Sequence, residues 1–252
     1  MKKIGKANIL GCFIDLLDMK QALLKIEEII KMGRPAQIIT LNAEIVYKAR
    51  NDEKLKKIIN SASLVTPDGI GIVWAARWLG YKIGSRVTGI DMVYNLCQMA
   101  AQKGWKLYFF GAAPGMAEKA GERLQNQYPG LNICGYRNGY FNDEDVPGII
   151  KKIKEASPHI LLVALGAPKQ EFFIEKYKKE LGVPVCIGVG GSFDVLAGVK
   201  KRAPGIFIRL NLEWLYRLLA EPSRFRRQLA LPRFAWLVIK SSWREKSSRN
   251  KV

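Results

Sequence analysis

Short apolar segments alternate with amphipathic helical segments along most of this chain, and this alternation limits the possible folds more than any other feature. The apolar segments read as strands at 37–41, 64–66, 106–110, 131–136, 160–165 and 185–189. Apolar residues at three- and four-residue spacing, typical of helices, occur at 21–31, 42–51, 53–61, 70–79, 92–103, 116–128, 146–157 and 170–181. Strands that are apolar almost throughout are typical of a parallel sheet buried on both faces. We therefore predict an α/β fold, a Rossmann-like, doubly wound and mostly parallel sheet with helices on both faces.

The alternation stops near Gly198–Pro204, where basic residues become more frequent. We therefore predict an α/β domain over residues 1–198 and a helical C-terminal appendage over 199–252. Within the appendage, residues 206–220 read as one helix. Pro222 and Pro232 are expected to divide the remainder into short helical pieces, because proline interrupts a helix.

Composition excludes several classes of protein. With 252 residues and a hydrophobic fraction of 48%, the chain can build a packed core and is not disordered. Asp15 and Asp18 interrupt the apolar stretch near the N-terminus, and no run of about 18 apolar residues follows, so neither a signal peptide nor a transmembrane helix is expected. The four cysteines form no CxxC pair, which argues against a zinc knuckle or disulfide framework and fits a reducing cytoplasm: Cys12, Cys97, Cys134 and Cys186.

The chain is strongly basic, and the excess charge is concentrated in the predicted appendage. The formal net charge is +19, and residues 199–252 hold 14 Lys and Arg against 3 Asp and Glu. Three of the six tryptophans, Trp214, Trp236 and Trp243, lie there as well. Cations interleaved with aromatic residues are typical of a segment that binds an anionic membrane surface. The same composition also fits a site for single-stranded nucleic acid, or a solvated basic helix packed on the core.

Two glycine-rich loops follow predicted strands, Gly111–Gly115 (GAAPG) and Gly188–Asp194 (GVGGSFD). Backbone N–H groups at such strand-to-helix turns can hold a phosphate, although an ordinary turn uses the same residues. Ligands of doubly wound sheets bind at the carboxyl ends of the strands, so two such loops favour a nucleotide or nucleotide-sugar ligand.

Asp68 is the best candidate for a reactive carboxylate. It lies in the TPDG turn between a short strand and a helix, where a carboxylate can accept a proton from a hydroxyl nucleophile. A helix N-cap or turn role is the alternative. Arg86 is a candidate phosphate clamp.

Other chemistry finds little support. His159, the only histidine, precedes a strand at the opposite edge of the sheet, so a structural role is expected and a Ser-His-Asp mechanism has no base. Residues 143–145 (DED) match the DxD pattern of metal-binding glycosyltransferases, but acids in a first helical turn are typical of capping, and we predict no metal. A nucleic-acid-binding protein is one alternative; it would bind oligonucleotides with a strongly salt-dependent affinity and would not need Asp68. A dehydrogenase or methyltransferase would bind its cofactor at Gly111–Gly115, but the acidic ribose anchor of such sites is not evident.

Eight motifs occur in an order that resembles one family over nearly the whole chain. They read TLNAEIVYKAR, TPDGIGIVWAARWLG, RVTGIDM, YFFGAAPG, LGAPKQE, GVGGSFDVLAG, KRAPG and EWLYRLLAEPSRFRR. The ordered set resembles the WecG/TagA/CpsF glycosyltransferases, glycosyltransferase family 26. The C-terminal motif points to the branch of N-acetylmannosaminyltransferases that act in wall teichoic acid synthesis.

The resemblance implies a reaction and its partners. Such enzymes transfer N-acetylmannosamine from UDP-ManNAc to the C4 hydroxyl of GlcNAc on undecaprenyl diphosphate, with inversion and without a metal or other cofactor. It further implies a cytoplasmic enzyme, peripheral on the inner face of the cell membrane, that binds an anionic membrane surface and forms a homo-oligomer in solution, with no nucleic-acid partner. A different UDP-sugar in another surface-polysaccharide pathway is the alternative, because neither composition nor spacing distinguishes the donor sugars.

The resemblance also implies site residues. Asp68 of the PDG motif would be the general base, and Thr40 and Asn42 of the TxN motif would flank the sugar. Arg86 of RVTG and Gln170 of PKQE would be polar pocket residues. The nucleotide-sugar would be held by residues of three loops: Gly111, Pro114, Gly115, Gly166, Pro168, Lys169, Glu171, Gly190, Gly191 and Asp194.

Three arginines of the C-terminal motif, Arg217, Arg224 and Arg227, would close over the site and hold the lipid diphosphate at the membrane. Without a metal, cations of the protein must stabilise the leaving diphosphate. If the appendage completes the site only on a bilayer, membrane docking would control activity, and deletion beyond about residue 198 would leave a folded but nearly inactive domain.

Overall fold

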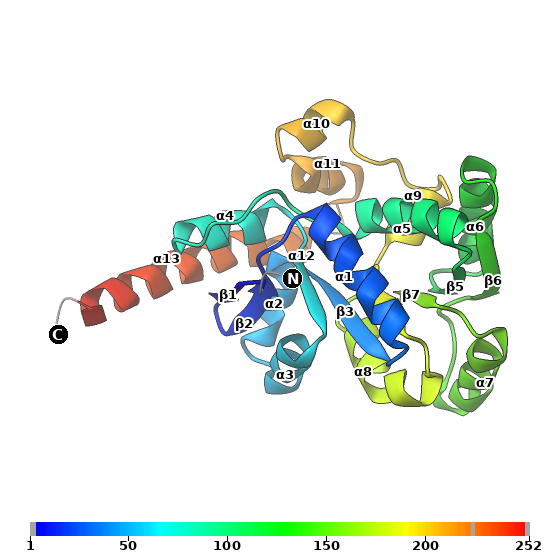
Figure 1. The fold of residues 1–252 in the computed structure, drawn as a ribbon. Coiled ribbons are helices and arrows are strands. Elements are labelled where there is room, and N and C mark those ends of the chain that lie inside the picture. Colours follow the sequence, from blue (N-terminus) through cyan, green and yellow to red (C-terminus); the bar gives the residue numbers. More distant parts are fainter. Residues whose placement is uncertain (1–3, 223–224, 250–252) are drawn as a thin grey trace.

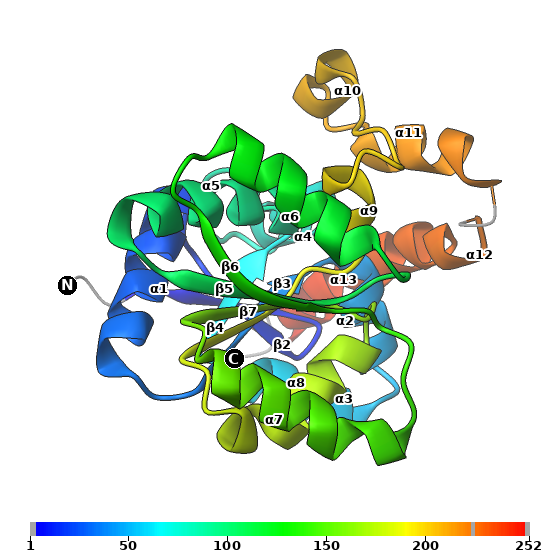
Figure 2. The same cartoon turned by 90° about the vertical axis from the view of Figure 1, so that its right-hand side faces the viewer.

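The computed structural model describes residues 4–222 and 225–249. Within these residues, a central sheet of six parallel strands has the order β4-β3-β8-β7-β5-β6 (Figures 1 and 2). The α/β fold with a parallel sheet is confirmed, and every predicted strand is present. The strands are β3 (Ala36–Leu41), β4 (Leu64–Pro67), β5 (Lys106–Gly111), β6 (Asn132–Arg137), β7 (Ile160–Ala164) and β8 (Val185–Gly188).

Helices cover both faces of the sheet because successive strand residues point to opposite sides. Ile38 and Phe109 face one helical layer, and their neighbours Ile39 and Phe110 face the other. Figure 2 shows the two layers above and below the sheet. The first layer contains α1 (Met19–Met32), α5 (Gly89–Lys103), α6 (Met116–Gln127) and α9 (Ser192–Leu196). The second contains α2 (Ala43–Ala49), α3 (Glu53–Ser61), α7 (Val146–Ala156) and α8 (Lys169–Leu181).

The strand order creates a crevice at the carboxyl ends of β5 and β7. These two strands are neighbours, but the chain leaves β5 toward the sheet edge at β6 and leaves β7 in the opposite direction toward β8. Loops that diverge from adjacent strands leave space between them, which is where doubly wound sheets bind ligands.

A small antiparallel hairpin near the N-terminus was not expected from the sequence. It consists of β1 (Lys6–Ile9) and β2 (Cys12–Asp15), and Asp15 accepts a hydrogen bond from Val65 N at 2.8 Å. Its turn places both Leu10 and Gly11 at positive φ. The turn has Leu-Gly where a hairpin usually has Asn-Gly or Asp-Gly, because leucine rarely adopts a positive φ. The usual sequence signal of a hairpin is therefore missing here.

The C-terminal helices differ from the prediction in two places. The single helix predicted over 206–220 is wrong: Asn211, at φ 60°, separates α10 (Gly205–Arg209) from α11 (Glu213–Ala220). After Pro222 come α12 (Phe225–Gln228) and α13 (Ala230–Arg249). The predicted break at Pro232 is wrong, because Pro232 lies within the 20-residue helix α13. It occupies the first turn of α13, where backbone N–H groups have no partner within the helix and proline is tolerated.

The first part of α13 packs against the body of the molecule and the rest of this helix projects from it, while α10 and α11 stand out on another side (Figure 1). Phe234 and Val238 of α13 are buried against α2 and α4 (Ile70–Trp78). Part of the C-terminal segment thus shares the core with the α/β domain. The division at residue 198 remains a prediction. Among the described helices, none is both long and apolar enough to cross a membrane.

Candidate active site

Several of the predicted site residues that the structure describes lie at the carboxyl edge of the sheet, in two groups. The first, which we call the Asp68 cluster, combines the ends of β3 and β4 with the start of α5 and with α11. Its members are Thr40, Asp68, Arg86, Glu213 and Arg217. The second is a hollow at the ends of β5, β6 and β7. Residues far apart in the chain thus meet because parallel strands end at one edge.

Asp68 is fixed by backbone contacts on both sides. Its N–H donates to Leu41 O at 2.8 Å, and its carboxylate accepts a hydrogen bond from the N–H of Gly89. The Cβ of a side chain at position 89 would lie 3.4 Å from Thr40 Oγ1 and 3.8 Å from Asp68 Oδ2. Thr40 and Asp68 therefore border the same small space, which a side chain at position 89 would fill.

The charges around Asp68 act in opposite directions. Burial is the main reason that the pKa of the Asp68 carboxyl is raised from 3.8 to about 6. Arg217, the N–H of Gly89 and Arg86 act to lower this pKa, and Glu213 acts to raise it. A carboxylate with a pKa near 6 is ionised at neutral pH and remains basic enough to accept a proton from a hydroxyl group during a reaction. Two guanidinium groups beside it can stabilise negative charge on a phosphate.

Glu213 joins the two arginines of this cluster. Its Oε2 lies 3.2 Å from Arg86 Nη1, and its Oε1 lies 2.7 Å from Arg217 Nη2. A second nitrogen of Arg86 donates to the carbonyl oxygen of Ile208 at 3.4 Å. The Asp68 cluster is therefore built partly from the C-terminal segment.

Three predicted residues are engaged in contacts within the protein. Asn42 is the N-cap of α2, and its Oδ1 accepts a hydrogen bond from Ile45 N at 3.0 Å. Gln170 is buried, accepts a hydrogen bond from Gly190 N at 3.0 Å and donates to Glu171 Oε1 at 2.9 Å. Burial raises the pKa of the Glu171 carboxyl. In this structure Gln170 and Glu171 fix the glycine-rich loop after β8.

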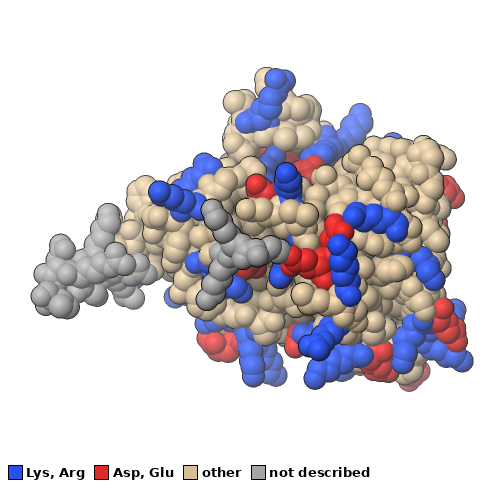
Figure 3. All heavy atoms as spheres, in the orientation of Figure 1, with Lys and Arg blue, Asp and Glu red and all other residues tan. Residues whose placement is uncertain are grey.

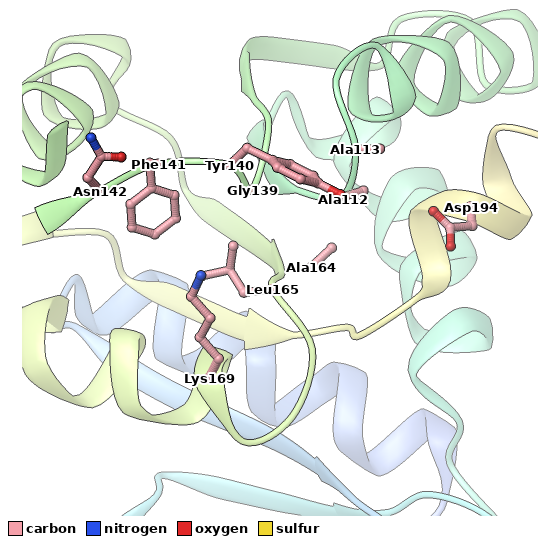
Figure 4. Close-up of a pocket in the computed structure, with 10 residues that line it drawn as sticks. All are labelled: Ala112, Ala113, Gly139, Tyr140, Phe141, Asn142, Ala164, Leu165, Lys169 and Asp194. Atoms are coloured by element: carbon pink, nitrogen blue, oxygen red, sulfur yellow. The ribbon is translucent and has the colours of Figure 1, made fainter. Parts of the chain in front are cut away.

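The hollow has a volume of about 790 Å³ and lies between the loops that follow β5, β6 and β7 (Figure 4). Asp194 of α9 faces it from the side opposite Tyr140, and Lys169 extends toward Phe141, with Nζ 4.9 Å from the ring centre. Asp194 also pairs with Lys200 at 2.9 Å, which in turn lies 3.4 Å from Glu221. The lining residues are Ala112, Ala113, Gly139, Tyr140, Phe141, Asn142, Ala164, Leu165, Lys169 and Asp194.

The glycine-rich turns bring backbone close to backbone beside this hollow. Gly111 has a φ of 127°, and a Cβ there would lie 2.4 Å from the carbonyl of Ala164. Gly115 is the N-cap of α6, with Pro114 before it, and Gly190 and Gly191 precede α9. Gly166 and Pro168 form the turn that leads into α8, where Pro168 is the N-cap. The three loops predicted to hold a nucleotide-sugar therefore surround or adjoin one hollow.

Sequence reasoning missed two contributions to the site. The first is the segment Gly139–Asn142, which follows β6 and lines the hollow. Its position just after a predicted strand could have indicated this role. The second is Glu213. It lies in the same motif as Arg217, but its pairing with Arg86 depends on tertiary packing and gives no local signal. Of the predicted arginines, Arg217 joins the Asp68 cluster. Arg224 and the side chain of Arg227 lie outside the described residues.

The acids at 143–145 and the histidine have structural contacts. Asp143–Asp145 form a short 3₁₀ helix, η1, before α7, and Asp145 accepts a hydrogen bond from Asn142 N at 2.9 Å, as in a capping box. His159 Nδ1 accepts a hydrogen bond from Lys106 N at 2.9 Å, away from the loops of the site. In the part of the chain that the structure describes, no three His, Cys, Asp or Glu side chains gather as metal ligands would.

Comparison with known proteins gives a consistent result. The model of the glycosyl transferase WecG/TagA/CpsF family matches residues 7–248. A protein of Bacillus spizizenii named N-acetylglucosaminyldiphosphoundecaprenol N-acetyl-beta-D-mannosaminyltransferase is 40% identical over 208 residues, which cover 82% of this chain and 80% of the relative. Proteins of the same name are 38% identical over 212 residues in Bacillus subtilis, covering 84% and 82% of the two chains, and 33% identical over 247 residues in Staphylococcus aureus, covering 97% and 96%.

Proposed function

Because the chain belongs to the WecG/TagA/CpsF family of glycosyl transferases, we propose that it transfers N-acetylmannosamine from UDP-ManNAc to the C4 hydroxyl of GlcNAc on undecaprenyl diphosphate. The relatives are named for transfer of this sugar to this lipid-linked acceptor. The reaction would form the linkage unit of wall teichoic acid. Transfer from a different UDP-sugar is the alternative within the same family.

The observation that carries the proposal is the environment of Asp68, a partly buried carboxylate with a pKa of about 6 between two arginines. In the transfer, the Asp68 carboxylate accepts the proton of the acceptor hydroxyl as its oxygen attacks C1 of the donor sugar. The bond from C1 to the phosphate oxygen breaks on the opposite face, and UDP leaves with the electron pair. This displacement inverts the configuration at C1.

Arg86 and Arg217 would stabilise the charge that develops on the leaving diphosphate. They lie beside Asp68 in the Asp68 cluster, so the base and the cations can act on one donor molecule. With guanidinium groups in this position, the proposed reaction needs no metal. We assign the uridine to the hollow, where Tyr140 offers an exposed ring and Lys169 a cation.

The lipid-linked acceptor would be reached at a membrane surface. The C-terminal helices expose large apolar side chains: Ile206, Leu210, Trp214, Leu219, Phe225, Trp236 and Trp243. Lys and Arg side chains are spread over the face seen in Figure 3, with acidic residues among them. Apolar and aromatic residues enter the interface of an anionic bilayer while the cations contact its headgroups. We therefore propose a peripheral enzyme on the inner face of the cell membrane. From the family resemblance we further propose that it self-associates in solution and has no nucleic-acid partner.

UDP release from UDP-ManNAc, with a GlcNAc-diphosphate-lipid acceptor in anionic vesicles, tests the proposal. We expect acceptor-dependent release by the wild type and a rate about 10²- to 10⁴-fold lower in Asp68→Asn, because the variant lacks the base. Asp52→Asn is the matched control, since asparagine can also cap α3, whose N-cap is Asp52.

Unchanged release by Asp68→Asn would remove Asp68 as the base while leaving the family assignment in place. Absence of release by the wild type would contradict the donor, and other UDP-sugars would then be compared in the same assay.

A further inference from the structure

Glu213 stands apart from the surface acids of this protein in its burial and its partners. Its side chain is 9% exposed, and both carboxylate oxygens contact arginines, 3.2 Å from Arg86 Nη1 and 2.7 Å from Arg217 Nη2. By contrast, Glu155 pairs with Lys151 at 4.0 Å on α7 and is 63% exposed. Exposed ion pairs of that kind contribute little to folding stability. A buried carboxylate, in contrast, is destabilising unless cations or hydrogen-bond donors pair with it.

The contacts of Glu213 connect two separate parts of the chain. Arg217 lies one turn further along α11, but Arg86 belongs to the loop before α5. The second nitrogen of Arg86 reaches Ile208 O in α10. Figure 1 shows that α10 and α11 stand out from the layers of the sheet. The Arg86–Glu213 pair is therefore a direct attachment of these helices at the Asp68 cluster.

We propose that Glu213 is a positioning residue of the transfer reaction, which holds Arg86 and Arg217 together and keeps α11 closed over Asp68. The inference rests on the proposed function for its catalytic consequence. It adds a residue that touches neither donor nor acceptor and acts through two arginines and the base.

The charge of Glu213 has a second consequence for Asp68. The groups that act on the Asp68 carboxylate are Arg217 and Glu213 of α11, Arg86, and the N–H of Gly89 at the start of α5, while Thr40 of β3 lies across Gly89. Without Glu213, Arg86 and Arg217 would lose the carboxylate that pairs with both of them, while still acting on Asp68. A carboxylate held in such ion pairs is a weaker base. Glu213 therefore keeps the arginines near Asp68 without allowing them to neutralise its basicity.

The first test is the pH dependence of UDP release by Glu213→Gln. Glutamine keeps the size of the side chain but removes the negative charge, so the pKa of Asp68 should fall. We expect the acid limb of the kcat profile to move to lower pH, and kcat at neutral pH to fall about tenfold because the base is weaker. Glu155→Gln, the same change at an exposed ion pair on α7, should leave both quantities as in the wild type.

The second test follows the attachment of α11 without using catalysis. In Glu213→Ala, amide hydrogen exchange over residues 206–220 should become faster than in the wild type and in Glu155→Gln, because Arg86 loses its partner on α11. We expect kcat of this variant to fall about 100-fold, as misplacement of groups by about 1 Å can cause.

The outcomes separate this inference from the proposed function. The inference would be overturned if Glu213→Gln kept the kcat and acid limb of the wild type and Glu213→Ala kept its kcat and its rate of amide exchange. Faster exchange with an unshifted acid limb in Glu213→Gln would also overturn it, because Glu213 would then only stabilise the fold. If the wild type itself releases no UDP, the proposed function fails, and the exchange comparison still decides whether Glu213 holds α11.

Discussion

Asp68 shows how a single position can remain open in the sequence and be decided by its neighbours. Its place in the TPDG turn allowed a general base or a helix cap. In the structure Gly69, not Asp68, is the N-cap of α4, and the Asp68 carboxylate accepts a hydrogen bond from Gly89 N instead. Asn42 shows the reverse case, because a residue predicted to flank the sugar caps α2 with its side-chain oxygen. A residue's type and position in a motif do not reveal which long-range partner it meets.

The pKa of Asp68 predicts the pH dependence of the reaction. This pKa is raised to about 6, chiefly by burial, and a carboxylate can act as the proposed base only when it is ionised. From pH 5 to pH 7 the ionised fraction rises from about one-tenth to about nine-tenths. We expect kcat/KM for UDP release to rise about tenfold over this range and then level off, measured at constant ionic strength.

Circular dichroism at pH 5 and pH 7 provides the control, since the folded fraction must stay constant over that range. A rate that does not change between pH 5 and pH 7 would contradict Asp68 as the ionising base.

At the scale of elements, the strand-turn-helix units carry the site, and most of them were predictable from period and turn residues. The unit β5–α6 is the clearest case, because the apolar segment ends at GAAPG and the helix follows. The elements that were missed depend on tertiary contacts or on unusual turn residues. The β1–β2 hairpin has Leu10 at positive φ, and α10 and α11 are separated at Asn211.

Gly111 is predicted to be essential for the β5–α6 unit. Alanine there would need a φ of 127° and would place Cβ 2.4 Å from the Ala164 carbonyl. We expect Gly111→Ala to lower the free energy of unfolding by at least about 2 kcal/mol, because backbone rather than a flexible side chain must move. Urea unfolding followed by circular dichroism measures this change.

Gly148→Ala is the matched control. Gly148 lies in α7 and has no atom within 4 Å of a built Cβ, so alanine should stabilise the helix by up to about 1 kcal/mol. Equal stability of the two variants would contradict the close approach of β5 and β7 at their carboxyl ends.

At the scale of the whole molecule, the C-terminal segment has two roles that the sequence presented as one. Its composition indicated a basic-aromatic surface. In the structure the same helix α13 buries Phe234 and Val238 in the core while Trp236, between them, is 59% exposed. A truncation after residue 198 would therefore also remove core side chains, and loss of activity in such a protein would not by itself report on the membrane.

Two substitutions in α13 separate these roles. Phe234 is 1% exposed, so Phe234→Ala should lower the free energy of unfolding by about 3 kcal/mol through the cavity it leaves. Trp236→Ala should change stability by less than about 0.5 kcal/mol but weaken binding to anionic vesicles, because an interfacial aromatic ring is lost. Urea unfolding and vesicle co-sedimentation measure the two effects.

Each variant serves as the control for the other. Weakened vesicle binding by Phe234→Ala at a temperature where it is folded, together with normal binding by Trp236→Ala, would contradict the assignment of the exposed face of α13 to the membrane.

The sequence alone determined the α/β class, the parallel sheet and the family, because these depend on local periodicity and on motifs read along the chain. Only the tertiary structure decided that Arg86, Glu213 and Arg217 lie around Asp68, that Gln170 binds Gly190 N, and that α13 buries Phe234 and Val238 while it exposes Trp236. These contacts join residues that are remote in sequence and depend on how the C-terminal helices pack against the strand ends. Local patterns specify the elements, but ion pairs and burial between distant elements are set by their packing.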